Sequence, residues 1–136
     1  MKGTYVLLIE LPKSAEIQVG SLGKIKFQAG FYAYVGSALR GLEPRIERHL
    51  RREKKLYWHI DHLLAHGRIR KIFYSEKKEC DTARKLAARF ASIKGFGSSD
   101  CDCESHLFYS EDYGRISEIV RKLCDKFEML QNPQMH

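Results

Sequence analysis

The 136-residue sequence contains no apolar run long enough to cross a membrane, which takes about 18 to 20 residues. The apolar stretch at residues 4–11 includes Glu10 and lacks a small-residue cleavage site, so it is typical of a strand rather than a signal peptide. No internal repeat or low-complexity segment is present. These absences predict one domain over residues 1–136, located in the cytoplasm and without a membrane partner.

Cysteine is also scarce, with four residues in the whole chain. Without an export signal, they are expected to be thiols or metal ligands rather than disulfides. Cys101, Cys103 and His106 form a C-x-C-x-x-H pattern, and Cys80 begins a predicted helix nearby. Together the four side chains offer a tetrahedral ligand set for Zn²⁺. The alternative is a tight loop that contains buried thiols.

Acidic residues are in deficit, with 17 Asp and Glu against 24 Lys and Arg and a net charge of +7. A surplus this large on a small domain indicates a polyanionic partner, because neutralised phosphates release counterions. The alternative is a charge that only keeps the protein in solution. The surplus is densest in a helix predicted at residues 42–54. At about 100° per residue, the apolar positions of this helix share one stripe and the basic positions share the next, formed by Arg45, Arg48, His49 and Arg52.

Strand-forming and helix-forming segments alternate along the chain. Strands are predicted at residues 4–11, 15–19, 24–28, 30–37, 69–74 and 107–109, and helices at 42–54, 57–65, 80–92 and 113–129. Residues 13–28 are expected to be an inserted hairpin, and residues 113–129 a closing helix. This order predicts an α+β domain with a small, mainly antiparallel sheet flanked by helices.

The segment Tyr34-Val35-Gly36-Ser37-Ala38 ends one predicted strand, and the basic helix follows it. This order resembles the second half of the signature of the GIY-YIG nucleases, and Gly3-Thr4-Tyr5 matches the first half. The resemblance covers roughly the first 65 residues well and the remainder weakly. It is closest to a largely archaeal branch of domains of unknown function. The inserted hairpin separates the two tyrosines by more residues than in the family, and the loop before Arg45 is one residue longer.

The resemblance implies metal-dependent hydrolysis of phosphodiester bonds in DNA, in repair or processing. Tyr5 would position or deprotonate the attacking water, and Tyr34 would hydrogen-bond the water or the phosphate. Because a phenol has a pKa near 10, Tyr5 needs a charged neighbour to act as a base. Arg45 would bind the phosphoryl oxygens, and His49 would assist proton transfer with a pKa near neutrality. The expected nucleic-acid contacts are Ser37, Arg40, Arg48 and Arg52.

The family also places a glutamate for Mg²⁺ or Mn²⁺ on the helix after the third core strand. The aligned position here, near residues 84–86, holds no acid. Glu79 is the first substitute, with Asp81 beside it, and Asp61 on the preceding predicted helix is another. Magnesium often takes only one or two protein carboxylates, so one of these residues can serve. If none does, only nucleic-acid binding remains.

Two functions therefore stay open. One is a DNA endonuclease, and the other is a non-catalytic module that binds nucleic acid through the same basic surface. DNA is favoured over RNA as the partner, but no base-reading motif stands out. A third interpretation is a structural domain of a larger repair assembly. The sequence allows no obligate protein partner to be inferred.

Overall fold

Strand β1 (Gly3–Leu11) lies inside the main sheet and divides the core into two halves. The computed structural model describes residues 3–38, 41–51, 54–97 and 102–124. An interior strand is covered on both faces, which is why its sequence is apolar almost throughout. The odd-numbered residues from Tyr5 to Leu11 pack into one core cluster. Val6 and Leu8 point the other way and pack into a second cluster.

The main sheet has five strands in the order β5-β1-β4-β7-β6, and all its pairings are antiparallel. Its other strands are β4 (Gly30–Ala38), β5 (Arg68–Ser75), β6 (Ala91–Ser92) and β7 (Leu107–Ser110). In the β1–β4 pair, Tyr5 lies opposite Gly36 and Leu7 lies opposite Tyr34. The two tyrosines are therefore diagonal neighbours on one face of the sheet.

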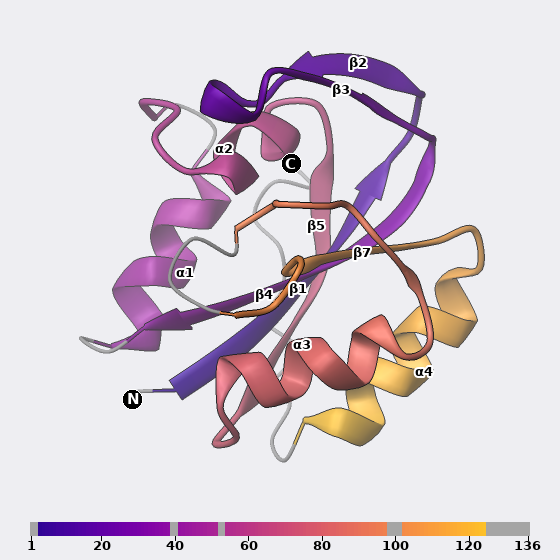
Figure 1. Ribbon diagram of the computed structural model, residues 1–136. Coiled ribbons are helices and arrows are strands. Elements are labelled where there is room, and N and C mark those ends of the chain that lie inside the picture. The colour runs from indigo at the N-terminus through magenta and orange to yellow at the C-terminus, as the bar shows by residue number, and fades with distance from the viewer. Residues whose placement is uncertain (1–2, 39–40, 52–53, 98–101, 125–136) are drawn as a thin grey trace.

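Figure 1 shows helices on both faces of this sheet, which confirms the predicted α+β class. One face carries α1 (Leu42–Leu50), α2 (His59–Leu64) and the hairpin of β2 (Ala15–Gln18) and β3 (Lys24–Phe27), which is present as expected. A 3-10 turn, η1 (Gly20–Leu22), connects the hairpin strands. The other face carries α3 (Glu79–Ala87) and α4 (Tyr113–Leu123). In the described ranges, no helix has the length and apolar character needed to cross a membrane.

Helix α1 ends earlier than the sequence predicts. It stops at Leu50, where Arg51 turns to an extended backbone, and residues 52–53 lie outside the described part of the chain. The Lys54 ammonium donates to the carbonyls of Arg48 and His49. In a longer helix those carbonyls would accept from backbone N–H groups four residues on. The lysine thus caps a helix that its periodicity would have extended.

Two further helix ends differ from expectation or fall outside the described residues. Helix α3 ends at Ala87 instead of residue 92, because Ala91 and Ser92 pair with β7 as strand β6. The closing helix α4 ends at Leu123, with Cys124 in an extended conformation. Residues 125–129 of that prediction are not among the described residues.

Candidate functional site

Tyr5 and His49 form a buried polar pair between the sheet and α1. The Tyr5 hydroxyl and His49 Nε2 are 2.6 Å apart and share a hydrogen bond. Both side chains are fully buried, and their ring centroids are 5.4 Å apart. His49 Nδ1 is also buried and finds no hydrogen-bond partner in the described part of the chain. His49 is therefore buried in the interior and is not part of the basic stripe that the sequence predicts on this helix.

Gly36 explains how the Tyr5 phenol reaches its position. A Cβ atom built on Gly36 would come within 2.4 Å of both Cζ and Oη of Tyr5. No side chain larger than hydrogen fits there, so the glycine of the Tyr-Val-Gly segment makes room for the phenol of the neighbouring strand. The resemblance identified the motif, but the pairing of β1 with β4 supplies its steric reason.

The electrostatics of this pair correct two expectations from the sequence. Burial raises the pKa of Tyr5 well above its usual value, and the opposing charge of Arg45 does not offset this. Burial also lowers the pKa of His49 to about 3, with the nearby Lys54 charge acting in the same direction. Both groups are therefore neutral near pH 7. The expectation of an imidazole titrating near neutrality is wrong, and Tyr5 neither contacts solvent nor ionises readily as a base.

Tyr34 and Arg45 lie nearer the surface than this pair. The Tyr34 ring is half-buried, and its centroid lies 6.4 Å from that of Tyr5 and 6.2 Å from that of His49. Burial raises the pKa of Tyr34, and the charge of Glu79 adds to this effect. Arg45 is half-buried and donates from Nη1 to the Ser37 carbonyl at 3.1 Å. Among the described residues, Arg45 forms no ion pair with a carboxylate. We call Tyr5, Tyr34, Arg45 and His49 the tyrosine site.

Arg48 and Asp61 form a closed ion pair beside this site. Arg48 donates to both carboxylate oxygens of Asp61, at 2.8 and 2.9 Å. Asp61 Oδ2 also accepts from the backbone N–H groups of Tyr57 and Trp58. Burial alone would raise the pKa of Asp61, but these hydrogen bonds lower it overall. Because Asp61 is fully buried and anchors the start of α2, the structure contradicts its assignment as a metal ligand.

Sequence reasoning missed the aromatic side chains next to the two arginines. The Cζ atoms of Arg45 and Arg48 lie 4.4 and 4.2 Å from the centre of the Trp58 ring. Tyr57 contacts Trp58 edge-on and is 79% exposed. Exposed aromatic rings beside guanidinium groups are typical of surfaces that stack unpaired bases. The signal was available in the sequence as Leu56-Tyr57-Trp58, directly after the basic segment.

Glu79 lies beside a second group of side chains. Its negative charge raises the pKa of both Tyr5 and Tyr34, as does that of Asp61. Its Oε2 atom lies 3.7 Å from Nδ1 of His106, on the loop that leads into β7. Asp81, the other acid of the first turn of α3, is exposed and lies within 3.3 Å of Arg84. Of the carboxylates considered from the sequence, Glu79 is half-buried beside His106, Asp81 is exposed, and Asp61 is buried in its pair with Arg48.

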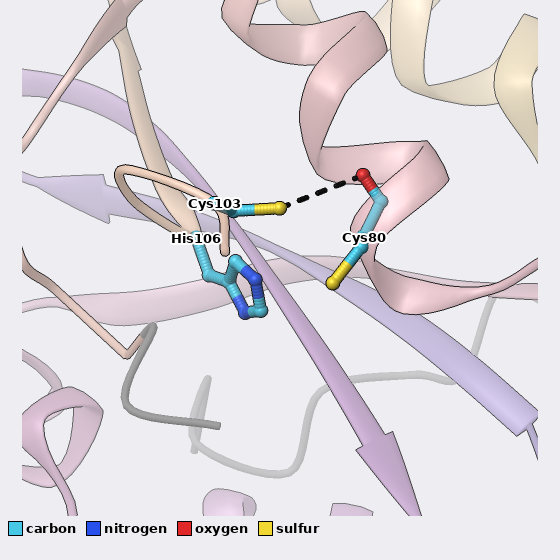
Figure 2. Close-up of side chains that lie close together, drawn as sticks. All are labelled: Cys80, Cys103 and His106. Atoms are coloured by element: carbon cyan, nitrogen blue, oxygen red, sulfur yellow. Dashed lines mark hydrogen bonds between the residues drawn. The ribbon is translucent and has the colours of Figure 1, made fainter. Parts of the chain in front are cut away.

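The second group consists of Cys80, Cys103 and His106, which we call the cysteine cluster. One ligand atom from each lies within 4.8 Å of the others, an arrangement that could hold a metal ion. Figure 2 shows Cys80 in the first turn of α3, facing the side chains of the loop before β7. Both ring nitrogens of His106 are buried without a hydrogen-bond partner among the described residues. The Cys103 sulfur donates to the Cys80 carbonyl at 3.7 Å.

The state of the cysteines differs in part from expectation. Cys103 and Cys124 are not in disulfides, as predicted. Cys80 forms a disulfide, which contradicts the expectation of thiols throughout. The second sulfur of that disulfide is not among the described residues. Three further predicted site residues also lie outside the described ranges, namely Arg40, Arg52 and Cys101.

The chain belongs to a family described as Domain of unknown function DUF123, whose model matches residues 4–129. The match includes both the tyrosine site and the cysteine cluster. Neither the curated proteins nor the solved structures provide a significant match.

Proposed function

We propose that this domain binds a nucleic acid, DNA in preference to RNA, and hydrolyses a phosphodiester bond with the help of Mg²⁺ or Mn²⁺. The observation that carries the proposal is the grouping of Tyr34 with the buried Tyr5–His49 pair between the sheet and α1, the helix that also bears Arg45. The charges of Arg45 and Glu79 both act on the Tyr34 phenol. The resemblance to GIY-YIG nucleases, carried by Tyr5, Tyr34, Gly36 and Arg45, supports the same reaction.

Each accessible group of the site suits one task in such a reaction. Arg45 has no carboxylate partner among the described residues, so its guanidinium can donate hydrogen bonds to a phosphate in bidentate fashion. This contact gains strength where charge grows on the phosphoryl oxygens. The Tyr34 hydroxyl can orient the water or a phosphate oxygen. Tyr5 and His49 form a neutral support behind it, because their pKa values keep both uncharged near neutrality.

Glu79 is the residue that would hold the divalent cation. A hard cation prefers carboxylate oxygen and usually keeps several waters, so one protein carboxylate together with substrate phosphate is a sufficient ligand set. Asp61 is excluded because Arg48 and two backbone N–H groups occupy its oxygens. When bound, the ion would supply charge stabilisation for the leaving oxygen. For the cysteine cluster we propose a softer ion, Zn²⁺.

A non-catalytic binding module remains the second candidate, favoured by a specific observation. Tyr5 is fully buried, and its hydroxyl is engaged by His49, so substrate cannot reach it in this arrangement. Binding through Arg45, Arg48 and the exposed Tyr57 ring would not need that access. Such a module, like the enzyme, would act inside the cell, where we place this protein by its sequence.

The two candidates separate in a cleavage assay with matched variants. Branched and linear DNA, and the same sequences as RNA, are incubated with Mg²⁺ or Mn²⁺ and wild-type protein, Arg45→Ala or Glu79→Gln. Arg121→Ala and Glu118→Gln, on the exposed surface of α4, remove the same charges elsewhere. Cleavage that both site variants lower at least 100-fold, and the controls retain, supports the enzyme. Salt-sensitive binding without cleavage supports the module, and the absence of both overturns the proposal.

A further inference from the structure

We infer that the cysteine cluster is a Zn²⁺ site in the reduced protein, with Cys80, Cys103 and His106 as ligands and Glu79 as the carboxylate that orients His106. The part that concerns Glu79 adds to the proposed function, because the same residue is the candidate ligand of the hard cation. The ligand set itself is independent of any activity on nucleic acid.

The first argument is the composition and spacing of the donors. Two sulfurs and an imidazole within 4.8 Å of one another match the soft and borderline ligands that Zn²⁺ takes in proteins. The hard cations proposed for Glu79 prefer oxygen, so the two sites would not compete for one ion. The three ligands come from α3 and from the loop before β7, which leaves the fourth position of a tetrahedron for a further donor.

The second argument is the isolation of His106. Its side chain is only 1% exposed, and neither ring nitrogen has a hydrogen-bond partner among the described residues. A buried polar group left without a partner destabilises a protein by about 1–3 kcal/mol. A metal ion on one nitrogen would remove this penalty. The backbone holds the residue firmly, since the amide of His106 donates to Phe96 and its carbonyl accepts from Val35.

The third argument is the position of Glu79. Metal-bound histidines usually direct the second ring nitrogen at a carboxylate, which fixes the ring orientation. Oε2 of Glu79 lies 3.7 Å from His106 Nδ1, so a small closing movement would complete such a contact. Glu79 also precedes Cys80 in the first turn of α3. An ion in the cluster would therefore fix the helix end that presents Glu79 to the tyrosine site.

The disulfide at Cys80 sets the condition for this site. A thiolate binds zinc well, whereas a disulfide sulfur does not. A dithiol reductant removes the obstacle by thiol–disulfide exchange: its two sulfurs join in a new disulfide, and Cys80 and its former partner each leave as a thiol. Loss of the thiol proton then accompanies metal binding. The disulfide and the metal ion are thus alternative states of the same sulfur.

The test uses the full chain and needs no nucleic acid. Reduced wild-type protein is equilibrated with Zn²⁺, freed of excess metal and analysed by elemental mass spectrometry, where one equivalent per chain is expected. Cys103→Ser and His106→Leu should lose this equivalent, and Cys124→Ala, which changes a cysteine of the second core cluster, should keep it. Glu79→Gln should keep the ion but bind it about tenfold more weakly. Asp81→Asn, in the same helical turn, should match wild type.

Two further measurements use wild-type protein only, so they do not depend on whether the variants fold. Substitution of wild-type protein with Co²⁺ should give a thiolate charge-transfer absorption and the visible bands of a tetrahedral site. Treatment with hydrogen peroxide should release the metal, and a dithiol should restore binding. The inference is overturned if reduced wild-type protein takes up no metal. It is also overturned if the Cys103 and His106 variants both bind the metal as wild type does. Either result leaves the cleavage assay and its outcome unaffected.

Discussion

Two buried histidines of this protein, His49 and His106, have contrasting surroundings. In the tyrosine site, His49 Nε2 shares a hydrogen bond with the Tyr5 hydroxyl. The neighbouring Arg48 and Asp61 are also fully paired with each other. In the cysteine cluster, neither nitrogen of His106 has a described hydrogen-bond partner, although the side chain is as deeply buried as His49.

The difference in hydrogen bonding between the tyrosine site and the cysteine cluster indicates which of them a bound ligand would stabilise more. In the tyrosine site the Tyr5 hydroxyl is paired, as are the neighbouring Arg48 and Asp61, while His49 Nδ1 is buried without a partner in the described part of the chain. In the cysteine cluster both ring nitrogens of His106 are in that state, which a metal ion would relieve. The cysteine cluster therefore has more stability to gain from a bound ion than the tyrosine site.

The pH dependence of stability gives the largest effect by which this contrast can be tested. His49 has a pKa of about 3 in the folded protein, against the ordinary value of 6.5, because burial and Lys54 disfavour its charge. Below pH 6.5, His49 therefore becomes protonated in the unfolded chain but stays neutral in the folded chain. Stability due to the neutral imidazole is complete above this pH and falls by about 1.4 kcal/mol per pH unit down to about pH 3.

Urea unfolding of wild type and His49→Gln between pH 7.5 and 4.5 measures this slope. The groups facing the imidazole, which include Tyr5, Lys54 and Asp61, are the same in both proteins. The difference between the two curves therefore isolates one proton. Parallel curves would mean that His49 is not kept neutral by burial, and the description of the tyrosine site as a closed pair would fail.

Substitution of Gly36 by alanine tests the packing on which that pair depends. The new Cβ would lie 2.4 Å from two atoms of the Tyr5 ring, so the phenol must move away from His49. Overpacking of this kind should lower the free energy of unfolding by about 3 kcal/mol. The control Gly114→Ala, exposed on α4 with 3.4 Å to its nearest neighbour, should change stability by less than about 1 kcal/mol. Chemical denaturation measures both.

A Tyr5→Leu background shows whether the collision is the cause. The shorter side chain removes the two atoms that the new Cβ meets, so Gly36→Ala should cost much less there than in wild type. Equal costs in the two backgrounds would assign the loss to the backbone rather than to Tyr5.

A pair of leucine substitutions compares the two histidines directly. In metal-free protein, His49→Leu removes the imidazole partner of the buried Tyr5 hydroxyl and should destabilise by about 2 kcal/mol. His106→Leu removes two nitrogens that have no hydrogen-bond partner among the described residues, so stability should stay within about 1 kcal/mol of wild type or rise. Unfolding is followed with a chelator present and at constant redox potential. If His106→Leu were the more damaging change, the imidazole would have a structural role that its contacts do not reveal.

Much of the fold follows from local patterns in the sequence. The strand at residues 4–11, the hairpin and the strand beginning at Gly30 were predicted closely, because alternation, turn residues and apolar runs all act over short distances. The ends of α1 and α3 were not, because contacts with residues beyond each helix decide where it stops. Lys54 caps the first, and the edge of β7 pairs with the residues after the second.

The sequence allowed the residues of the site to be predicted, but not how deeply each of them is buried. The family resemblance implied that Tyr5, Tyr34 and Arg45 belong together, and the spacing of Cys101, Cys103 and His106, with Cys80 nearby, indicated a set of metal donors. The sequence could not show that His49 points inward, because the stripe that holds Arg45 and Arg48 lies next to the buried one on α1. Nor could it show that Asp61 is taken by Arg48, a partner 13 positions away. Burial decides the pKa of both groups, and burial is a property of the whole fold.

The smallest predicted effect concerns Arg48 and asks whether the ion pair beside the tyrosine site depends on the planar guanidinium. Arg48→Lys keeps the positive charge, but a single ammonium cannot reproduce two parallel hydrogen bonds to Asp61 or the contact with Trp58. We expect a loss of about 1 kcal/mol in the free energy of unfolding. Arg84→Lys is the matched control, because its contact with Asp81 is single and solvent-exposed and should contribute nothing measurable. If both substitutions were silent, the paired geometry around Asp61 would be dispensable. Tyr5, Gly36 and His49 would then be the residues on which the packing of the tyrosine site depends.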